Sequence, residues 1–509
     1  MTRIDLKTDK NFAILAFDFG TTAVKAVLLT CGCEVIGTST CGYDLLTTTI
    51  NFAEQNPHDY WLAAISAVKK VLATTSINPD SIVAISMCTQ GMGLIPLDRK
   101  GNVLHNNITW LDNRAGKQAD EINKKIGENY ATATSVVAKI KWLKENEEQI
   151  FHRTAFFADC TGFLTYKLTG QLHMELTNSS PYSLDPQQLY FKHKLYEAAG
   201  IPLSKMPSLK ICTSFVGYVT AEAALSLGVS TDVKVFMGSG DVPTSAAGAG
   251  CFVPGDSHIC LASSGWFSVL TEDTRLAKTS PGIYQIYGID KNTLIYGGGV
   301  QSVGMLLDWC INQFYRSEQE MLGDDIYNMI TRELDDLPPG SDGLVATPWL
   351  WGESCPISDE EVKAVFLNIS NKHDRRHFVK AAMESVFYSL KWQIEYYRTD
   401  TGKEISELGA IGGLCRSDYW LQMAADILQY PIYVPSNVEH AGAVGAGIIA
   451  NVGLGVTTFS DAKNLLRKEK TFVPNSNSKE VYDRNFEGFK LIYNHVKPLY
   501  TILKEKKDL

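Results

Sequence analysis

The first residues whose types and spacing could do chemistry form the segment Asp18-Phe19-Gly20-Thr21-Thr22. A glycine lets backbone amides approach a phosphate closely, because no side chain stands in the way. Thr21 and Thr22 add hydroxyl donors, and Asp18 adds a carboxylate of the kind that can hold hydrated Mg²⁺. A hairpin turn capped by Asp and Thr explains the same residues without any ligand. The segment alone is therefore compatible with a phosphate loop or with a plain turn.

A second candidate group follows the apolar residues 233–237, which predict a strand. Gly238-Ser239-Gly240-Asp241-Val242-Pro243 comes next and leads into small residues, and proline is typical of a first helical turn. Asp241 is therefore expected just before a helix N-terminus, where a carboxylate can cap the helix. The two preceding glycines favour a functional role instead, because a cap alone needs no open backbone before it.

Two further segments place polar chemistry beside expected elements. The apolar residues 408–411 lead into Gly412-Gly413 and Ser417, and an amphipathic helix follows. A flat ring could lie against this open backbone, although a packing turn explains the glycines as well. The segment Trp110-Leu111-Asp112-Asn113-Arg114 places an acid and a base on an expected loop. They could bind the hydroxyls of a polyol or simply form an exposed ion pair.

Two common nucleotide-binding patterns are missing from the sequence. No Gly-x-x-x-x-Gly-Lys-Ser/Thr occurs, which excludes a P-loop fold. Gly442, Gly445 and Gly447 have the wrong spacing for a dinucleotide fingerprint and fall within an expected helix. A dehydrogenase is therefore disfavoured.

Composition limits the remaining classes of protein. The 509 residues carry 47 Lys and Arg against 56 Asp and Glu, a formal net charge of −9, and 45% of them are hydrophobic. Such a chain is globular rather than disordered or coiled-coil, and its acidity weighs against a nucleic-acid partner. The weakly polar residues 441–456 are too rich in glycine and alanine to span a membrane and predict a buried helix. Eleven scattered cysteines predict reduced, buried thiols in a cytoplasmic protein.

The candidate residues lie between predicted strands and helices. Residues 13–17 and 23–29 surround the first segment as a β-hairpin, and a further strand is expected near residues 34–38. Asn56-Pro57 is typical of a helix start, and residues 82–86 predict another strand. Hairpin, strand, helix and strand together indicate a mixed α/β fold.

A comparable start recurs in the second half of the chain. Residues 259–262 and 266–270 flank Ser263-Ser264-Gly265, and this second hairpin lies 245 residues after the first. We therefore expect two similar α/β halves, with a boundary in the Pro-Gly turn near residues 251–255. The predicted domains are residues 1–251 and 252–509.

The last third of the chain offers fewer signals. Residues 337–343 contain two prolines and two glycines and predict a surface turn. The tail after residue 466 is rich in Lys and Asn and predicts a last amphipathic helix with a frayed end.

In this order, the candidate segments resemble the FGGY carbohydrate kinases from about residue 14 to about residue 450. The motifs that carry the resemblance are Asp18-Phe19-Gly20-Thr21-Thr22, Trp110-x-Asp112-x-Arg114, Gly238-x-Gly240-Asp241, Ser263-Ser264-Gly265, Gly352-Glu353, Gly412-Gly413 and Glu439-His440-Ala441-Gly442-Ala443-Val444-Gly445-Ala446. The resemblance implies an α/β fold with two ribonuclease-H-like domains of the actin-like ATPase superfamily and a central cleft. It also implies transfer of the ATP γ-phosphate to a hydroxyl of a sugar or polyol.

Matching positions in this sequence take their expected roles from the family. Asp241 matches the catalytic base, and Asp18 falls near the Mg²⁺. The other implied contacts are Gly20, Thr21 and Thr22 for the first phosphate loop, Ser263, Ser264 and Gly265 for the second, Gly412, Gly413 and Ser417 for adenosine, and Gln90, Met92, Trp110, Asp112, Arg114 and Asp241 for the sugar. Ala262 stands where the family usually has glycine, so the second loop is expected to be stiffer. ATP and Mg²⁺ are the implied cofactors.

Within the family the chain looks most like xylulokinases, including Pro348-Trp349-Leu350-x-Gly352-Glu353. One departure concerns Gln90-Gly91-Met92-Gly93, because xylulokinases often have Gln-Met-His-Gly at this place. The missing histidine removes an expected sugar contact. A ketopentose such as xylulose is the first expectation, and gluconate, ribulose, a linear polyol or a deoxysugar remain open.

The expected partners are a small sugar and ATP, with neither nucleic acid nor membrane, and a homodimer is left open. A rival from another class is a non-catalytic actin-like sensor of nucleotide or sugar. Such a sensor would keep both phosphate loops but would not need Asp241 or the polar sugar loop, so their presence favours the enzyme.

Overall fold

The computed structural model describes two compact units. The described residues are 12–47, 49, 51–179, 184–185, 190–191, 193–272, 276 and 279–503. Unit 1 contains Met1–Gly248, Ile286–Thr293 and His440–Leu466, and unit 2 contains Ala249–Gln285, Leu294–Glu439 and Arg467–Leu509. The chain first leaves unit 1 close to the boundary that we predict at residues 251 and 252, and it later returns to unit 1 twice.

A seven-stranded sheet forms the centre of unit 1, with the order β13-β14-β5-β1-β2-β3 and with β15 beside β5. Its strands are β1 (Ala13–Phe19), β2 (Ala23–Thr30), β3 (Val35–Gly42), β5 (Ile82–Thr89), β13 (Phe215–Tyr218), β14 (Lys234–Phe236) and β15 (Ser239–Gly240). β1 and β2 form the predicted antiparallel hairpin, with Ala16 opposite Val27. β5 lies parallel to β1 on its other side, so β1 is a central strand and is buried almost throughout.

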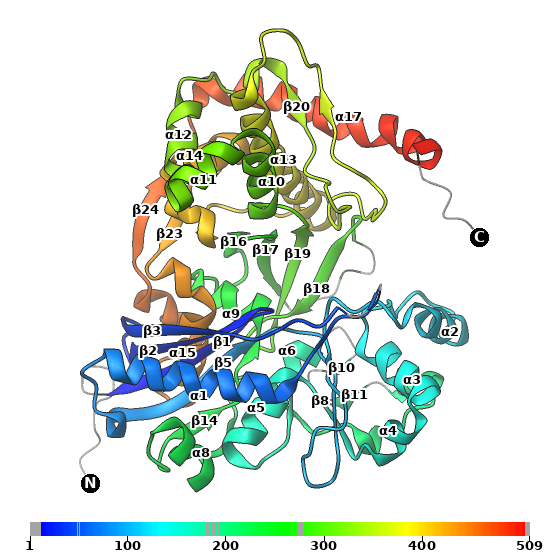
Figure 1. Ribbon diagram of the computed structural model, residues 1–509, viewed down its shortest axis with the longest axis vertical. Helices are drawn as coiled ribbons and strands as arrows, with labels where there is room; N and C mark the ends of the chain where they lie inside the picture. Colours follow the sequence, from blue (N-terminus) through cyan, green and yellow to red (C-terminus); the bar gives the residue numbers. More distant parts are fainter. Residues whose placement is uncertain are drawn as a thin grey trace. The chain divides into compact units, whose positions relative to one another are not determined.

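Two helices cover the strands of this sheet. α1 (Pro57–Thr74) packs on β2 and β3, as Figure 1 shows, and α15 (Ala441–Gly453) packs on β1 and β5. α1 begins as predicted, because the Asn56 side chain accepts from the His58 amide at 3.1 Å and Pro57 occupies the first helical turn. α15 confirms the predicted buried helix.

The remaining elements of unit 1 surround these layers. The helices are α2 (Gly116–Ile126), α3 (Val136–Asn146), α4 (Glu148–Arg153), α5 (Cys160–Thr169), α6 (Leu176–Ser179), α7 (His193–Ala199), α8 (Ala221–Leu227), α9 (Asp241–Gly248) and α16 (Phe459–Ala462). Four two-stranded pairs are β4 (Glu54–Gln55) with β7 (Asn107–Ile108), β6 (Ile95–Leu97) with β8 (Phe156–Ala158), β9 (Met174–Glu175) with β12 (Leu209–Lys210), and β10 (Leu184–Asp185) with β11 (Tyr190–Phe191).

A second seven-stranded sheet, of order β18-β19-β17-β16-β22-β23-β24, forms the centre of unit 2. Its strands are β16 (Ser257–Leu261), β17 (Gly265–Glu272), β18 (Ile283–Tyr287), β19 (Thr293–Val300), β22 (Leu408–Ile411), β23 (Ile432–Pro435) and β24 (Lys468–Phe472). β16 and β17 pair antiparallel and β22 lies parallel to β16, which repeats the arrangement of β1, β2 and β5. The predicted pair of similar α/β halves is therefore confirmed.

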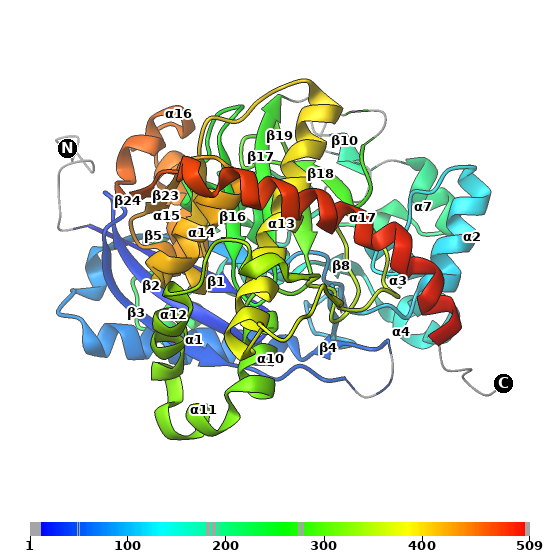
Figure 2. The same cartoon turned by 90° about the horizontal axis from the view of Figure 1, so that it is seen from above.

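The helices of unit 2 are α10 (Gly304–Phe314), α11 (Arg316–Leu322), α12 (Ile326–Asp335), α13 (Arg375–Thr401), α14 (Asp418–Leu428) and α17 (Lys479–Leu503), and a small pair of strands, β20 (Val345–Ala346) and β21 (Phe366–Leu367), lies beside them. α13 and α14 contact strands of the second sheet, and α10, α12 and α17 pack on these two helices. α17 crosses α13 (Figure 2). The predicted last helix is thus present, but β24 precedes it. Sequence reasoning missed β24 because its side chains are charged and mostly exposed, so no apolar alternation marks it.

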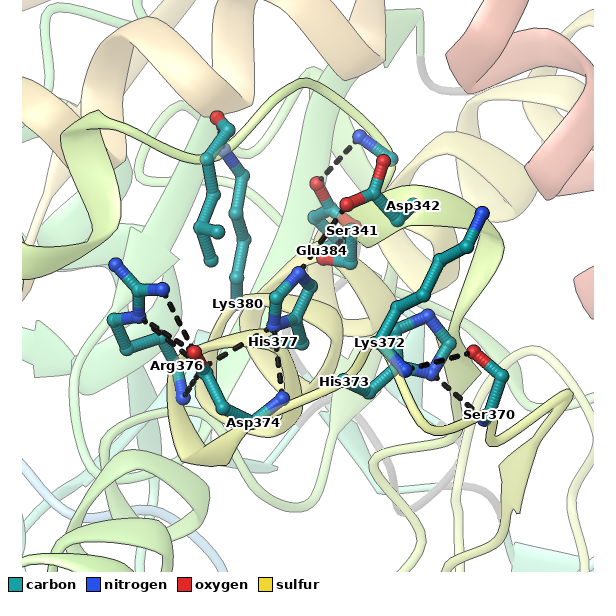
Figure 3. Close-up of polar contacts among 12 residues, drawn as sticks. Ser341, Asp342, Ser370, Lys372, His373, Asp374, Arg376, His377, Lys380 and Glu384 are labelled. Carbon is teal, nitrogen blue, oxygen red and sulfur yellow. Dashed lines mark hydrogen bonds and ion pairs between the residues drawn. The ribbon is translucent and has the colours of Figure 1, made fainter.

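A polar cluster joins the start of α13 to the turn at residues 340–343 (Figure 3). Asp374 caps the helix by accepting from the Arg376 amide at 2.9 Å. Glu384, which lies further along α13, accepts from the Gly340 amide and from the Ser341 hydroxyl, each at 2.9 Å. Burial raises the pKa of Glu384 to about 7. Ser341 is fully buried by these contacts, so the prediction of a surface turn was wrong at this residue.

Membrane and disulfide features agree with the composition. None of the described helices is both long and apolar enough to cross a bilayer. All eleven cysteines are buried, as predicted.

Helices α9 and α15 approach each other so closely that only glycine fits at the contact. A Cβ atom added to Gly445 would lie 2.0 Å from the Thr244 carbonyl oxygen, and one added to Gly248 would lie 2.0 Å from the Ala441 carbonyl oxygen. Backbone atoms cannot rotate away as a flexible side chain can. The two helices must separate if either glycine gains a side chain.

We expect Gly445→Ala to lower the free energy of unfolding by about 1–3 kcal/mol, the usual cost of overpacking. Urea denaturation measures this change. Gly488→Ala in α17 is the matched control, because an added Cβ there meets none of the described atoms within 4 Å. Alanine should stabilise that helix by about 0.5–1 kcal/mol. A Gly445→Ala protein as stable as the wild type would show that the close approach is dispensable.

Candidate functional site

The carboxyl ends of parallel strands gather the candidate residues of unit 1. Asp18 on β1 pairs with Cys88 on β5, and Cys88 pairs on its other side with Ser239 on β15. Parallel strands end at the same edge of a sheet, so the residues that follow them lie close together. Gly20, Gln90 and Asp241 are those residues.

Two carboxylates lie beside the Cys88 thiol at this edge. Burial raises the pKa of Cys88 well above its usual value, and the negative charges of Asp18 and Asp241 raise it further. Lys25 lies 3.7 Å from Asp18 Oδ2 and partly balances the negative charge. Gly442 of α15 leaves room for this arrangement, because an added Cβ would lie 3.0 Å from both the Asp18 Cγ atom and the Cys88 sulfur.

Asp241 is the first residue of α9 and its side chain is open to solvent. Its Oδ1 accepts from the Val242 amide at 2.9 Å. Partial loss of hydration, with a smaller contribution from the charge of Asp18, raises the pKa of Asp241 to about 6. A carboxylate with these properties is exposed enough to meet a substrate and basic enough to take a proton near neutral pH.

The backbone before Asp241 is held by residues that sequence reasoning missed. The Thr177 hydroxyl accepts from the Gly240 amide at 3.2 Å and lies 2.7 Å from the Ser239 hydroxyl. Glu175 accepts from the Thr177 amide at 2.8 Å, and burial raises the pKa of Glu175 to about 8. No local pattern marks these residues, because their role depends on contact with a strand some 60 positions later.

The turn between β1 and β2 is compact. The Gly20 amide donates to the Ala23 carbonyl at 3.0 Å, and the Tyr43 hydroxyl donates to the Gly20 carbonyl at 2.5 Å. Thr22 is exposed and Thr21 is half-buried. The turn therefore presents hydroxyl groups and backbone from a fixed frame, which fits the chemistry of phosphate binding.

Asp112 and Arg114 form a buried ion pair. The Arg114 Nε atom lies 2.8 Å from Asp112 Oδ1, and Arg114 Nη2 donates to Glu54 Oε1 at 2.7 Å. Asp112 Oδ2 also accepts from the Ala53 amide at 2.7 Å. The alternative interpretation of this segment as an exposed ion pair is therefore wrong, because both side chains are almost completely buried. Their contacts hold the loop that carries Trp110, which is 41% exposed.

Gln90 and Met92 follow β5 and differ in accessibility. Gln90 is 2% exposed and donates to Gln55 Oε1 at 2.7 Å, whereas Met92 is half-buried with a left-handed backbone, φ 59°. The Met92 carbonyl accepts from Lys139 Nζ at 3.0 Å. Burial lowers the pKa of Lys139 to about 7, against the opposing influence of Asp112. Lys139 was also missed, because α3 contains three lysines and the sequence does not show which of them is buried or what it contacts.

Unit 2 brings its two candidate segments to one edge of its own sheet. Ser263 lies in the turn between β16 and β17, and Gly265 is the first residue of β17. The Ser263 carbonyl accepts from the Val303 amide at 3.0 Å. Gly412 follows the parallel strand β22 with φ 105°, and an added Cβ would lie 2.5 Å from the Leu261 carbonyl oxygen. Ala262 has a negative φ, so its methyl group strains no backbone.

The segment from Gly412 to Ser417, which we expect to bind adenosine, is open at Gly413. Gly413 is exposed, and an added Cβ would meet none of the described atoms within 4 Å. Ser417 ends the short 3₁₀ turn that starts at Gly413 and precedes α14, and its amide donates to the Leu414 carbonyl at 3.1 Å. Bare backbone of this kind leaves room for a flat ring, as the sequence predicts.

Comparison with protein families now identifies the chain. Residues 13–248 match the N-terminal domain model of the FGGY family of carbohydrate kinases, and residues 261–454 match the C-terminal domain model of the same family. The chain belongs to the FGGY family of carbohydrate kinases. It is therefore a phosphotransferase that uses an alcohol group of a carbohydrate as acceptor, with the two-domain ribonuclease-H-like fold of the actin-like ATPase superfamily.

Relatives of this kinase carry more than one substrate name. A xylulose kinase of Bacillus subtilis is 28% identical over 502 residues, covering 96% of this chain and 98% of the relative. A gluconokinase of Bacillus licheniformis is 26% identical and covers 92% and 93%. The crystal structure of a ligand-bound xylulose kinase from Lactobacillus acidophilus has a TM-score of 0.85 at 23% identity, covering 97% of this chain and all of the other. The chain thus shares its fold with these kinases, but its similarity to them does not identify its sugar substrate.

Arg114→Met is expected to lower the free energy of unfolding of this kinase by about 3–5 kcal/mol, because it leaves the buried Asp112 carboxylate without its charge partner. Chemical denaturation followed by tryptophan fluorescence measures the loss. Asn113→Ala is the control in the same loop, since that side chain is exposed, and its effect should stay within about 0.5 kcal/mol. If the two variants were equally stable, the ion pair would not be what holds the loop.

Proposed function

We propose that this kinase transfers the γ-phosphate of ATP to a hydroxyl of a small sugar, with a ketopentose such as xylulose as the first candidate. One observation carries the proposal: Asp241, with a pKa of about 6, stands exposed at the strand edge that also holds Asp18 and the Gly20 turn. Phosphoryl transfer needs alignment and charge stabilisation more than covalent help from the protein, and this edge can supply both.

Asp241 would act as the general base. As the acceptor hydroxyl attacks the γ-phosphate, its proton would pass to the Asp241 carboxylate. The raised pKa makes this carboxylate a better proton acceptor than an ordinary aspartate, while most of it stays ionised at neutral pH. Thr177 would keep the carboxylate in place through the Gly240 amide.

Asp18 would hold Mg²⁺. Its carboxylate is only partly exposed and lies at the end of the central strand, and Mg²⁺ prefers one or two carboxylates together with water and phosphate oxygens. When bound, the ion would neutralise charge on the phosphates.

Each unit by itself offers a glycine-containing turn suited to the phosphates of ATP. Gly20, Thr21 and Thr22 of unit 1 and Ser263, Ser264 and Gly265 of unit 2 offer hydroxyls and backbone amides for phosphate oxygens. Gly412, Gly413 and Ser417 would receive the adenosine, because Gly413 leaves a flat open backbone.

The acceptor would meet Trp110 and Met92, which have accessible surface. Gln90, Asp112 and Arg114 are buried, so we assign them to holding the acceptor-binding loops and, for Gln90, to contact after a side-chain movement. Gluconate, ribulose or a polyol is the alternative acceptor. Met92 favours this alternative, because it cannot donate the hydrogen bond that a histidine would give.

Turnover on a panel of ketoses, aldonates and polyols tests the identity of the acceptor. Loss of one hydrogen bond to a hydroxyl costs about 1–3 kcal/mol, so an enzyme built for another sugar should use D-xylulose about 5- to 150-fold less efficiently than its best substrate. Coupled measurement of ADP release gives kcat/KM for each compound. If D-xylulose leads the panel by orders of magnitude, Met92 is a harmless variation and the acceptor is xylulose.

Asp241→Asn should reduce turnover by roughly 10²–10⁴-fold, because the hydroxyl loses its proton acceptor. ATP affinity and melting temperature should change little, since asparagine retains the shape and can still accept from the Val242 amide. In the wild type, turnover should fall about tenfold per pH unit below pH 6, because the base works only when deprotonated.

Asp241→Ala serves as the control for the alternative in which Asp241 only caps α9. That alternative predicts near-normal turnover for Asp241→Asn and a loss of stability only for Asp241→Ala. An Asp241→Asn protein that keeps more than about a tenth of wild-type turnover removes Asp241 from catalysis. The cytoplasmic location and a homodimer also stay predictions.

A further inference from the structure

Thr21 of the first phosphate loop is held from two directions. Its hydroxyl accepts from the indole Nε1 of Trp110 at 3.1 Å, and its carbonyl accepts from Gln55 Nε2 at 2.6 Å. Trp110 is the exposed aromatic ring of the acceptor loop, whereas Gln55 is 1% exposed. One residue of the phosphate loop is therefore bonded both to the acceptor side and to the interior of unit 1.

The side-chain amide of Gln55 connects three residues of unit 1. Its Oε1 accepts from the Tyr60 hydroxyl at 2.8 Å and from Gln90 Nε2 at 2.7 Å, while its Nε2 donates to Thr21. The Tyr60 hydroxyl in turn accepts from Asn107 Nδ2 at 2.8 Å. The planar amide thus links residues behind the acceptor loop to the phosphate loop, and a shift on one side must move the other.

The same short strand is tied to the acceptor loop a second time. Gln55 belongs to β4, and its neighbour Glu54 accepts from Arg114 at 2.7 Å. Arg114 pairs with Asp112 in the loop that carries Trp110. Acceptor contact at Trp110 would therefore restrain Thr21 directly through the indole and indirectly through β4.

We propose that Gln55 is a positioning residue that couples acceptor binding to ATP binding through Thr21. This inference rests on the proposed function, in which Thr21 binds phosphate and Trp110 binds the acceptor. An acceptor that immobilises Trp110 also orders Thr21, so ATP then binds to a loop whose ordering has already been completed. By linkage, ATP favours acceptor binding by the same factor. The phosphate loop that contains Thr21 is therefore better ordered for phosphoryl transfer when a sugar is bound than when water is the only possible acceptor.

The test is the effect of acceptor on nucleotide affinity. Calorimetry gives the dissociation constant of a non-hydrolysable ATP analogue with Mg²⁺, first alone and then with a saturating concentration of the best acceptor of the panel. In the wild type the acceptor should tighten nucleotide binding at least about 5-fold, the lower end of typical coupling between sites. A residue with a purely structural role changes stability and both dissociation constants but leaves their ratio intact.

Two substitutions at Gln55 interrupt the link in different ways. Gln55→Met removes all its side-chain hydrogen bonds and keeps the length of the side chain. Gln55→Glu keeps an oxygen for Tyr60 and Gln90 but loses the donor to the Thr21 carbonyl. In both, the ratio of the two dissociation constants should fall clearly below the wild-type ratio, because the link through Gln55 is lost, while the bond from the Trp110 indole to Thr21 retains part of the coupling.

Gln118→Met is the matched control, because Gln118 of α2 is also buried, with 4% exposure, and donates to Oε2 of Glu145 in α3 at 2.9 Å. It should lose stability as Gln55→Met does and keep the wild-type ratio. If Gln55→Met does not fold, Gln55→Glu and Tyr60→Phe decide, since Tyr60→Phe removes only the hydroxyl that joins Gln55 to Asn107.

The outcomes separate this inference from the function on which it rests. A wild type that phosphorylates an acceptor but shows a ratio of one overturns the coupling and leaves the kinase function intact. Retention of the wild-type ratio in the folded Gln55 variants overturns the role of Gln55. A wild type that phosphorylates no member of the panel overturns the proposed function, and the coupling with it.

Discussion

Parallel pairing of β5 with β1 on one side and with β15 on the other is the constraint on which the candidate site of unit 1 depends. It places the turn of the β1–β2 hairpin, the end of β5 and the start of α9 at one edge of the sheet. Asp18 and Asp241 come from positions more than 200 residues apart, yet both act on the pKa of the same thiol, Cys88. Without this register, none of the proposed chemistry would have its groups together.

The edge stays usable because small residues let helices lie close to it. α15 reaches β1 and β5 with Gly442 against Asp18, and Gly445 lets α9 approach α15 along the Thr244 carbonyl. Close packing holds the N-terminus of α9 in place, and Asp241 is its first residue. A rigid scaffold with an exposed carboxylate at its end is the arrangement that catalysis by positioning requires.

Buried polar groups make up the second layer of the site. Asp112 with Arg114, Lys139 with the Met92 carbonyl, and Thr177 with the Gly240 amide each connect a loop to a fixed element. Most of these side chains are too deeply buried to touch a ligand in this structure. Specificity and catalysis would then depend on residues behind the surface as much as on the few, such as Trp110, that are exposed. Gln55 belongs to the same layer, and its side-chain amide bonds to Thr21, Tyr60 and Gln90.

The sequence alone determined the two hairpins, the buried helix of residues 441–453, the position of Asp241 at a helix start and the likeness to FGGY kinases. These are local features: strand periodicity, proline and glycine at helix starts and turns, and short motifs are written in neighbouring residues. Only the tertiary structure decided that α15 belongs to unit 1, that the Asp112–Arg114 pair is buried, and that Gln55, Lys139 and Thr177 support the site. Those facts depend on contacts between distant segments, which no local pattern records, because burial and hydrogen-bond partners exist only once the chain has folded.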